Sequence, residues 1–278
     1  MNKESDMESR KICFIGAGNM SRSIISGLVR GGYPAQEITA SNPSRGKLDA
    51  LQQDFGIRVT QDNHEAASQA DVVVLSVKPQ LMEQVCNQLA DIDFSNKLVL
   101  TIAAGIPAHR YSDYLKQPLR LIRTMPNTPT QIGAGMTGLL SHPELSDTDK
   151  AFAEQMMRTG GDITWVDREQ DLNLVIALAG SSPAYFFLFI ESMINAGKNL
   201  GMDEAQARQL AQQAALGAAE MVIQNPELSV ANLRENVTSK GGTTAQALAT
   251  FEEGDLRNLV ERAMVNCIKR AEEMADTF

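Results

Sequence analysis

The sequence predicts an α/β fold followed by an all-α region, with a doubly wound parallel sheet in the N-terminal half. Up to about residue 167, apolar runs of strand length alternate with segments of helical spacing, and a glycine turn follows the first run. From residue 168 onward, alanine, glutamine, methionine and leucine at helical spacing replace the valine-rich runs. We therefore expect a polar tail at 1–10, a nucleotide-binding domain at 11–167 and an all-helical dimerisation and substrate domain at 168–278.

The first strand is expected at residues 11–15, and a glycine turn and an amphipathic helix follow it. In that turn Gly16 would make the bend, and Gly18 would let a pyrophosphate approach the backbone at the start of the helix. Ser21 stands where this fingerprint usually has its third glycine, so the match is incomplete. A lone Gly-x-Gly is weak, but its place after the first strand of an alternating chain predicts a Rossmann-type dinucleotide site.

The end of the second strand indicates which dinucleotide binds. Residues 38–40 lead into Ser41-Asn42-Pro43-Ser44-Arg45, without the acidic residue that normally binds the ribose hydroxyls of NAD. Two hydroxyls, an amide and the guanidinium of Arg45 instead suit a 2′-phosphate. The pattern favours NADPH. The alternative is a solvated loop in which Arg45 is an ordinary surface charge, and Glu37 is near enough to keep that option open. NADH also stays open as the cofactor.

Two further apolar runs, at 71–77 and 98–102, read as buried parallel strands. They end in Lys78-Pro79 and in Ala103-Ala104-Gly105, and the turn-rich segment 123–129 is expected to be a loop at the same edge. Ligands of open α/β sheets bind at the carboxyl ends of the strands. These segments are therefore candidates to line a cofactor crevice, although each alone is equally typical of an ordinary turn.

The C-terminal half should be nearly all helix. A long apolar helix from 171 to 200 is interrupted by Gly180-Ser181-Ser182-Pro183, because proline removes a helical hydrogen bond. Asp203 should cap an alanine-rich helix to about Gln224, and Asp255 should cap the last helix to about Ala275. Small residues give little apolar area per helix, so these helices are expected to pack against a second subunit. We predict a homodimer.

A second glycine turn, Val237-Thr238-Ser239-Lys240-Gly241-Gly242-Thr243-Thr244, stands directly before a helix that ends at Gly254. Thr243 and Gln246 have the spacing of a capping box, with Thr243 as N-cap. A helix N-terminus offers free N–H groups and a partial positive charge, so a small carboxylate would fit there without an arginine. A well-capped turn with no ligand explains the same spacing.

Composition limits the remaining function classes. The net charge of −9 disfavours nucleic-acid partners, and no uninterrupted apolar run of membrane-spanning length is seen in the sequence. The first ten residues lack a secretory apolar region, so we expect a cytoplasmic protein without membrane association. Three unclustered cysteines and three histidines show no ligand spacing, which predicts neither disulfides nor a metal site.

Six motifs together resemble those of pyrroline-5-carboxylate reductases over essentially the whole chain after the tail. They are Gly16-Ala17-Gly18-Asn19-Met20, Val77-Lys78-Pro79, Ala103-Ala104-Gly105, Met125-Pro126-Asn127-Thr128-Pro129, Ser182-Pro183-Ala184-Tyr185 and Thr238-Ser239-Lys240-Gly241-Gly242-Thr243-Thr244. The last motif is the most specific. The family usually has glycine at the position of Ser21, and often at that of Ser182, which bears on the cofactor turn and on the bend of the long helix.

The resemblance implies reduction of the imine of 1-pyrroline-5-carboxylate to L-proline with a nicotinamide hydride, the last step of proline synthesis. A protonated cyclic imine accepts hydride without a metal, so positioning is the main demand on the protein. The family pattern places the substrate carboxylate on Ser239, Gly242, Thr243 and Thr244. It makes the Thr244 hydroxyl the catalytic group, because that hydroxyl would hydrogen-bond the ring nitrogen.

On the cofactor side the resemblance implies binding by residues from five segments of the N-terminal half and one position of the helical half. They are Gly16, Ala17, Gly18, Asn19, Met20, Ser21, Ser41, Arg45, Asn63, Val77, Lys78, Pro79, Ala104 and Asn236. Family members interlock their helical domains as dimers, and some form rings of dimers. Two alternatives remain open: a β-hydroxyacid dehydrogenase, although Lys198 lacks the glycines typical of that catalytic helix, and a non-enzymatic NADP-binding sensor.

Overall fold

The computed structural model describes residues 9–142, 145–275 and 277, so most of the expected tail at 1–10 lies outside the described residues. The chain divides into two compact units. The first unit runs to Ser181 and resumes at Cys267, and the second comprises Ser182–Asn266. The domain limits expected from composition, 11–167 and 168–278, stay a prediction.

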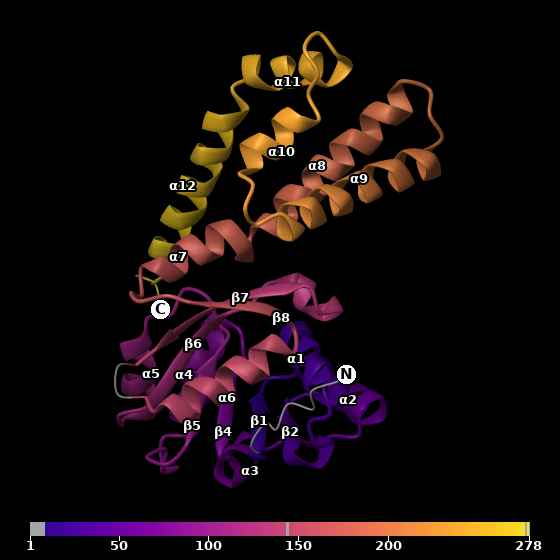
Figure 1. Ribbon diagram of the computed structural model, residues 1–278. Coiled ribbons are helices and arrows are strands. Elements are labelled where there is room, and N and C mark those ends of the chain that lie inside the picture. Colours follow the sequence, from indigo (N-terminus) through magenta and orange to yellow (C-terminus); the bar gives the residue numbers. More distant parts are fainter. Residues whose placement is uncertain (1–8, 143–144, 276, 278) are drawn as a thin grey trace. The chain divides into compact units, whose positions relative to one another are not determined.

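The first unit is built on an eight-stranded sheet in the order β3-β2-β1-β4-β5-β6-β7-β8 (Figure 1). Every neighbouring pair is parallel except β6 and β7, which run antiparallel. The strands are β1 (Ile12–Ile15), β2 (Ile38–Ser41), β3 (Arg58–Thr60), β4 (Val72–Leu75), β5 (Leu98–Thr101), β6 (Arg120–Met125), β7 (Gly135–Ser141) and β8 (Gly161–Trp165).

Helices cover both faces of this sheet, which confirms the doubly wound prediction. Alternate strand residues face opposite layers: Ile12 and Phe14 pack with α1, α2 and α6, whereas Cys13 and Ile15 pack with α3, α4 and α5. The helices and short turns of this part are α1 (Asn19–Arg30), η1 (Ala35–Glu37), α2 (Arg45–Phe55), α3 (Asn63–Gln69), α4 (Pro79–Asn87), α5 (Ala108–Leu115), η2 (Thr128–Ile132), α6 (Asp147–Arg158), α7 (Asp171–Val175) and the π-helix η3 (Ile176–Gly180).

The expectation of a loop over 123–129 is wrong for its first part. Arg123, Thr124 and Met125 belong to β6, where Arg123 pairs with Thr101 of β5 and is only 7% exposed. The turn-rich residues 126–129 made the whole segment look like a loop, but Arg123 and Thr124 are buried with partners from other segments. Pro126 follows the strand, where it cannot donate to a sheet ladder.

The second unit consists of helices and exposes most of its apolar side chains. Its elements are α8 (Ser182–Asn199), α9 (Glu204–Gln224), α10 (Val230–Asn236), α11 (Thr243–Glu253) and the first part of α12 (Leu256–Ala275). Among residues 182–266 only Pro183, Ala207 and Ala211 are buried. The rings of Phe189 and Phe251 pack with centroids 5.9 Å apart. The expected helical C-terminal half is confirmed.

The long apolar helix is interrupted where the sequence predicts it. Residues 176–180 form a π-helix, Ser181 bends, and α8 begins at Ser182. Pro183 therefore occupies the first turn of a new helix, where its missing N–H costs nothing. The Asn127 side chain donates to the Ala179 carbonyl at 3.0 Å and accepts from the Met136 N–H at 2.9 Å, which ties this turn to the sheet.

One helical run among the described residues meets the length and composition of a membrane span. It is Asp171–Asn199, with a mean hydropathy of 1.7 in its most apolar window, of which 17% is buried. The expectation of a protein without membrane association therefore stays a prediction. A helix that is covered by a second subunit meets the same criteria, so the run is weak evidence for a membrane.

Candidate active site

The glycine turn after β1 contains two glycines with different roles. The fold requires Gly16, whereas Gly18 borders open space in front of α1. Gly16 has a φ of 111°, and a Cβ there would lie 2.8 Å from the Ser76 carbonyl oxygen. Gly18 is the N-cap of α1, and a Cβ on it would meet no protein atom within 4 Å. Because nothing in the protein demands glycine at position 18, the open space in front of the helix fits the approach of a pyrophosphate.

Ser21 fits the turn although a glycine is usual at this point. Its buried hydroxyl donates to the Gly16 carbonyl at 2.8 Å, and the Ser76 hydroxyl lies 2.9 Å from the same oxygen. Two hydroxyls from α1 and from the end of β4 therefore hold the Gly16 carbonyl. The departure from glycine adds a hydrogen bond within the turn and leaves its backbone intact.

The end of β2 joins the glycine turn through backbone and side chains. The Gly16 N–H donates to the Ser41 carbonyl at 2.8 Å, and the buried Ser41 hydroxyl donates to Asn63 Oδ1 at 2.6 Å. The Asn42 amide is used within the loop, because its Oδ1 accepts from the Ala17 N–H at 3.3 Å. Arg45 begins α2, is exposed, and pairs with Asp49 at 2.9 Å.

The remaining cofactor candidates of this unit follow β4 and β5. Val77, Lys78 and Pro79 lead from β4 into α4, and Lys78 is exposed. Ala104 follows β5 and is half-buried. Because β1, β2, β4 and β5 are parallel neighbours, their carboxyl ends meet at one edge of the sheet. The structure thus brings the predicted residues from 16 to 104 to a single edge.

The substrate candidates form a second group, in the other unit, at the start of α11. Gly241 has a φ of 74°, and a Cβ on Gly242 would collide with the Ser239 hydroxyl. Thr243 and Thr244 are the first two residues of α11 and both are exposed. Their N–H groups precede the first helical hydrogen bond, which a helix N-terminus leaves available to an anion.

The predicted capping box at this helix is wrong. Gly242, not Thr243, is the N-cap: its carbonyl accepts the first helical bond, from Gln246 N–H at 3.2 Å. The Gly242 N–H itself donates to the Ser239 carbonyl at 3.0 Å, which tightens the turn and moves Thr243 into the helix. Asp203 does cap α9, as predicted, by accepting from the N–H groups of Ala205 and Gln206.

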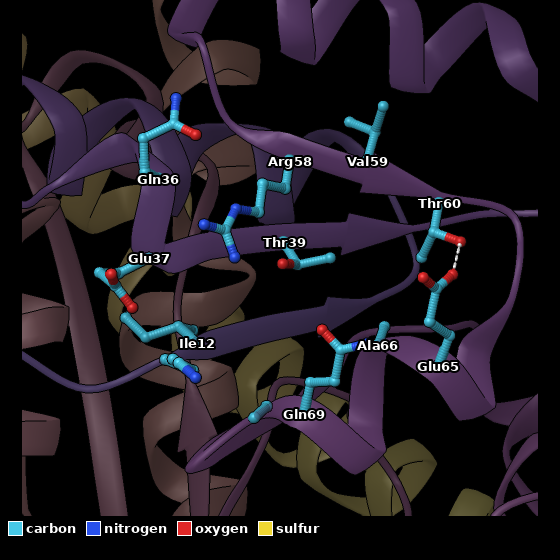
Figure 2. A pocket seen from close by; sticks show the side chains of 12 residues that line it. Ile12, Gln36, Glu37, Thr39, Arg58, Val59, Thr60, Glu65, Ala66 and Gln69 are labelled. Carbon is cyan, nitrogen blue, oxygen red and sulfur yellow. Dashed lines mark hydrogen bonds between the residues drawn. The ribbon is translucent and has the colours of Figure 1, made fainter.

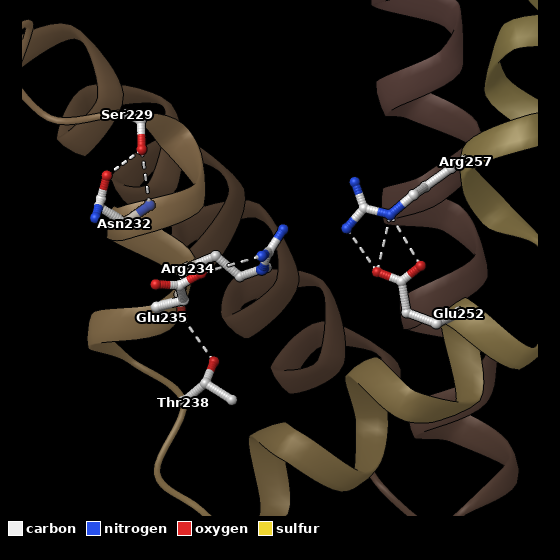
Figure 3. Close-up of polar contacts among 7 residues, drawn as sticks. All are labelled: Ser229, Asn232, Arg234, Glu235, Thr238, Glu252 and Arg257. Carbon is white, nitrogen blue, oxygen red and sulfur yellow. Dashed lines mark hydrogen bonds and ion pairs between the residues drawn. The ribbon is translucent and has the colours of Figure 1, made fainter.

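Asn236 ends α10, a short distance along the chain from this turn, and it is exposed. Figure 3 shows the contacts that hold the connection: the Thr238 hydroxyl donates to the Arg234 carbonyl at 2.6 Å. In the same view Arg257 forms two-pronged contacts with Glu252 on α11, and these hydrogen bonds lower the pKa of the Glu252 carboxyl. Side chains of this unit therefore hold the connection after α10 and the C-terminal end of α11.

Two cavities of the first unit differ in their relation to the cofactor edge. One of about 210 Å³ is lined by Ile12 at the start of β1 and Arg58 at the start of β3, toward the amino ends of the strands (Figure 2). The other, about 530 Å³, is lined by residues that include Asn63 and His64, after β3. Only the second adjoins a predicted cofactor residue.

The described residues offer no thiolate nucleophile or metal cluster at this edge. Burial raises the pKa of the Cys13 thiol to about 12, and that of Cys86 likewise to about 12. Within the described ranges no three histidine, cysteine, aspartate or glutamate side chains gather to hold a metal. The edge can therefore bind and orient through amides, hydroxyls, Lys78 and Arg45, which suits a reaction whose hydride comes from a bound dinucleotide.

Sequence reasoning left two contributors out of its site residues. Asn42 holds the Ala17 N–H, and Ser76 holds the Gly16 carbonyl, so both shape the glycine turn. Each is a polar residue directly after a buried strand. That position is a usable signal, because polar groups at strand ends line the binding edge of a parallel sheet.

Comparison with known proteins identifies the family. Residues 169–274 match the family described as pyrroline-5-carboxylate reductase dimerisation, and residues 11–105 match NADP oxidoreductase coenzyme F420-dependent. The pyrroline-5-carboxylate reductase of Vibrio alginolyticus is 57% identical over 98% of this chain and 100% of its own length. This chain belongs to the pyrroline-5-carboxylate reductase family. The family recognised from the six motifs, the enzyme class and the two-part fold are thereby confirmed.

Solved structures of pyrroline-5-carboxylate reductases share the fold over nearly the whole chain. The enzyme from Coxiella burnetii superposes with a TM-score of 0.90 at 41% identity, over 96% of this chain and 99% of that chain. The one from Plasmodium falciparum, determined with NADP bound, gives 0.87 at 27% identity, over 97% and 99%. The alternatives of a β-hydroxyacid dehydrogenase and a non-enzymatic sensor find no comparable support.

Proposed function

We propose that this chain reduces 1-pyrroline-5-carboxylate to L-proline with NADPH, the final step of proline biosynthesis, and also accepts NADH. The observation that carries the proposal is the 57% identity to a pyrroline-5-carboxylate reductase across both full lengths. It is supported by two glycine turns, each placed before the N-terminus of a helix. One would hold a phosphate group and the other a carboxylate, the two anionic ends that this reaction brings together.

The cofactor edge would hold NADPH through the residues described above. The open space at Gly18 and the N–H groups at the start of α1 fit a pyrophosphate, and no carboxylate ends β2 to compete with a 2′-phosphate. Arg45 would bind that phosphate, since its guanidinium is exposed and held only by a surface ion pair. When bound, the nicotinamide supplies the hydride that reduces the imine carbon.

The substrate turn would bind and orient the ring. Because the Gly242 N–H already donates to Ser239, the groups left for a carboxylate are the N–H groups of Thr243 and Thr244. The exposed Thr244 hydroxyl would hydrogen-bond the ring nitrogen, to orient it and to hold the proton that this nitrogen carries. Ser239 and Gly242 complete the turn, and Asn236 at the end of α10 is proposed to contact the cofactor.

The test is NADPH oxidation at 340 nm on addition of pyrroline-5-carboxylate. We expect Thr244→Ala to lower kcat by roughly 10²-fold, the usual contribution of a positioned proton-transfer group, with little change in KM for NADPH. Thr250→Ala is the matched control, because Thr250 is an exposed threonine of the same helix whose hydroxyl donates to the Gln246 carbonyl. An equal loss in both variants, or a rise in KM for NADPH alone, would reject the role of Thr244.

We also propose that the chain works as a cytoplasmic homodimer, without membrane or nucleic-acid partners. The match of residues 169–274 to a dimerisation family supports self-association, and the net charge of −9 disfavours nucleic acid. A second subunit would cover the apolar run of 171–199. Light scattering without detergent would distinguish a dimer from the rings of dimers that some family members form.

A further inference from the structure

Arg123 is a buried cation with one carboxylate partner and one unsatisfied atom. It is 7% exposed, its Nη1 donates to Glu169 Oε1 at 2.5 Å, and its Nε is buried without a hydrogen-bond partner. Glu169 reaches it from the segment before α7, and its side chain is 43% exposed. A charge desolvated in this way needs its partner, so Arg123 holds the Glu169 carboxylate at a fixed place.

The same Glu169 oxygen accepts a second hydrogen bond, from the backbone N–H of Ala108 at 2.6 Å. Ala108 is the first residue of α5 and closes the loop that begins after β5. A carboxylate at a helix N-terminus satisfies a donor that has no partner inside the helix and complements the helix dipole. Glu169 therefore fixes the far end of this loop.

The near end of the loop is fixed as well. The Ala103 N–H donates to the Thr101 hydroxyl at 3.3 Å, and this hydroxyl lies 2.7 Å from that of Tyr111 on α5. Between the two ends, Gly105 has a φ of 77°, and a Cβ there would lie 3.0 Å from Met274 Cβ. Ala104 is thus carried on a short turn that is held at both ends and has little room to shift.

We propose that Arg123 and Glu169 are positioning residues for NADPH. Arg123 orients Glu169, and Glu169 holds Ala108. The loop from the end of β5 to Ala108 thereby keeps Ala104 at the cofactor edge. The inference rests on the proposed function, because contact between Ala104 and the dinucleotide is part of it. It adds two side chains that touch neither cofactor nor substrate and that come from outside the glycine turn.

The experiment compares Glu169→Ala with Glu169→Gln in the full chain. The alanine variant loses both hydrogen bonds. We expect KM for NADPH to rise about tenfold while kcat changes less, because the free energy of one hydrogen bond to a charged group corresponds to about a tenfold change in affinity. The glutamine variant keeps Oε1 as acceptor for Ala108, so it should restore most of the NADPH affinity. Arg123→Met should resemble the alanine variant, because Glu169 is then no longer held.

Arg158→Ala is the matched control, because Arg158 forms an exposed ion pair with Asp162 at 2.8 Å, far from this loop in sequence. Thermal melting separates positioning from folding. A lower Tm with unchanged KM for NADPH in Glu169→Ala would overturn the proposal, as would a glutamine variant no better than alanine. NADPH affinity is also measured directly by fluorescence. If Glu169→Ala weakens it while wild type fails to reduce pyrroline-5-carboxylate, the positioning role stands and the proposed reaction falls.

Discussion

The two units of this chain bury their apolar residues in different ways. The first closes an apolar layer on each face of its sheet, and Phe14 and Val73 are completely buried within one chain. The second buries three side chains, whereas Phe186, Phe187 and Leu188 stay 66%, 63% and 64% exposed. Both are made of regular elements, so secondary structure does not account for the difference.

The difference shows that only the first unit is complete as a single chain. Apolar surface left in water loses about 25 cal/mol of burial free energy for each Å². Helices that are apolar on every side are stable only when other surfaces cover them. The second unit therefore behaves as half of an interface, in agreement with its match to a dimerisation family. The edge proposed to bind the cofactor therefore needs no partner for its framework. The turn proposed to bind the substrate belongs to the second unit, which does need one.

The largest effect is expected from charging the exposed phenylalanines. In the double variant Phe186→Glu/Phe187→Glu, the proposed subunit interface loses about 2 kcal/mol of burial free energy for each phenylalanine removed. We expect the dimer to weaken at least roughly 10³-fold and the reductase activity to fall with it. Sedimentation or light scattering over a concentration series measures the change.

Leu81→Glu is the control, because Leu81 is an apolar side chain on α4 of the first unit with an exposed fraction of 47%. It should leave the mass and the activity unchanged. A dimer that survives the double phenylalanine substitution, or that dissociates equally with Leu81→Glu, would contradict the view that the second unit alone is incomplete.

The elements that the sequence predicts best are those set by local pattern. The strand, glycine turn and helix at residues 12–30, the break before Pro183 and the Asp203 cap all follow from neighbours in the chain. The small residues of the C-terminal helices likewise predict packing against a second subunit. These features need no knowledge of distant segments.

The features that sequence reasoning missed depend on distant partners. Arg123 looked like a loop residue because its carboxylate partner, Glu169, is 46 positions away. Thr243 looked like an N-cap because the spacing to Gln246 is right, but the turn between Gly242 and Ser239 moves the helix start by one residue. Spacing predicts which groups are available, and only the fold shows which of them are already bonded.

An intermediate effect should separate the two glycines of the cofactor turn. Gly16→Ala would place a Cβ at a φ of 111°, 2.8 Å from the Ser76 carbonyl, and strain of this kind costs about 1–3 kcal/mol. Gly18→Ala meets no atom within 4 Å, so its free energy of unfolding should stay close to that of wild type. Its NADPH affinity should nevertheless fall roughly tenfold, because the methyl group occupies the space left for the pyrophosphate.

Chemical unfolding measures the free energy of unfolding of Gly16→Ala and Gly18→Ala, and titration measures their NADPH affinity. Since the first unit packs its own core, Gly16→Ala should lower stability without dissociating the dimer. Full NADPH affinity in Gly18→Ala would show that the space before α1 serves some other purpose, and it would remove the main structural support for the cofactor edge.

The smallest effect is expected at Arg45. Its side chain is 58% exposed and pairs with Asp49, so Arg45→Ala should raise KM for NADPH only about threefold to fivefold and leave KM for NADH unchanged. Lys47→Ala removes another exposed positive charge from the same helix and should alter neither value. A parallel rise for both cofactors would mean that Arg45 acts through general charge and does not recognise the 2′-phosphate.

Arg45→Ala also tests the independence of the two units when it is combined with Phe186→Glu/Phe187→Glu, the variant that we expect to dissociate. If the cofactor edge is complete in one chain, direct NADPH titration should show the same threefold to fivefold loss in monomer and dimer, although only the dimer reduces substrate. A loss that disappears in the monomer would mean that the partner shapes the edge around Arg45. The contrast between a self-contained cofactor unit and a partner-dependent substrate unit would then have to be abandoned.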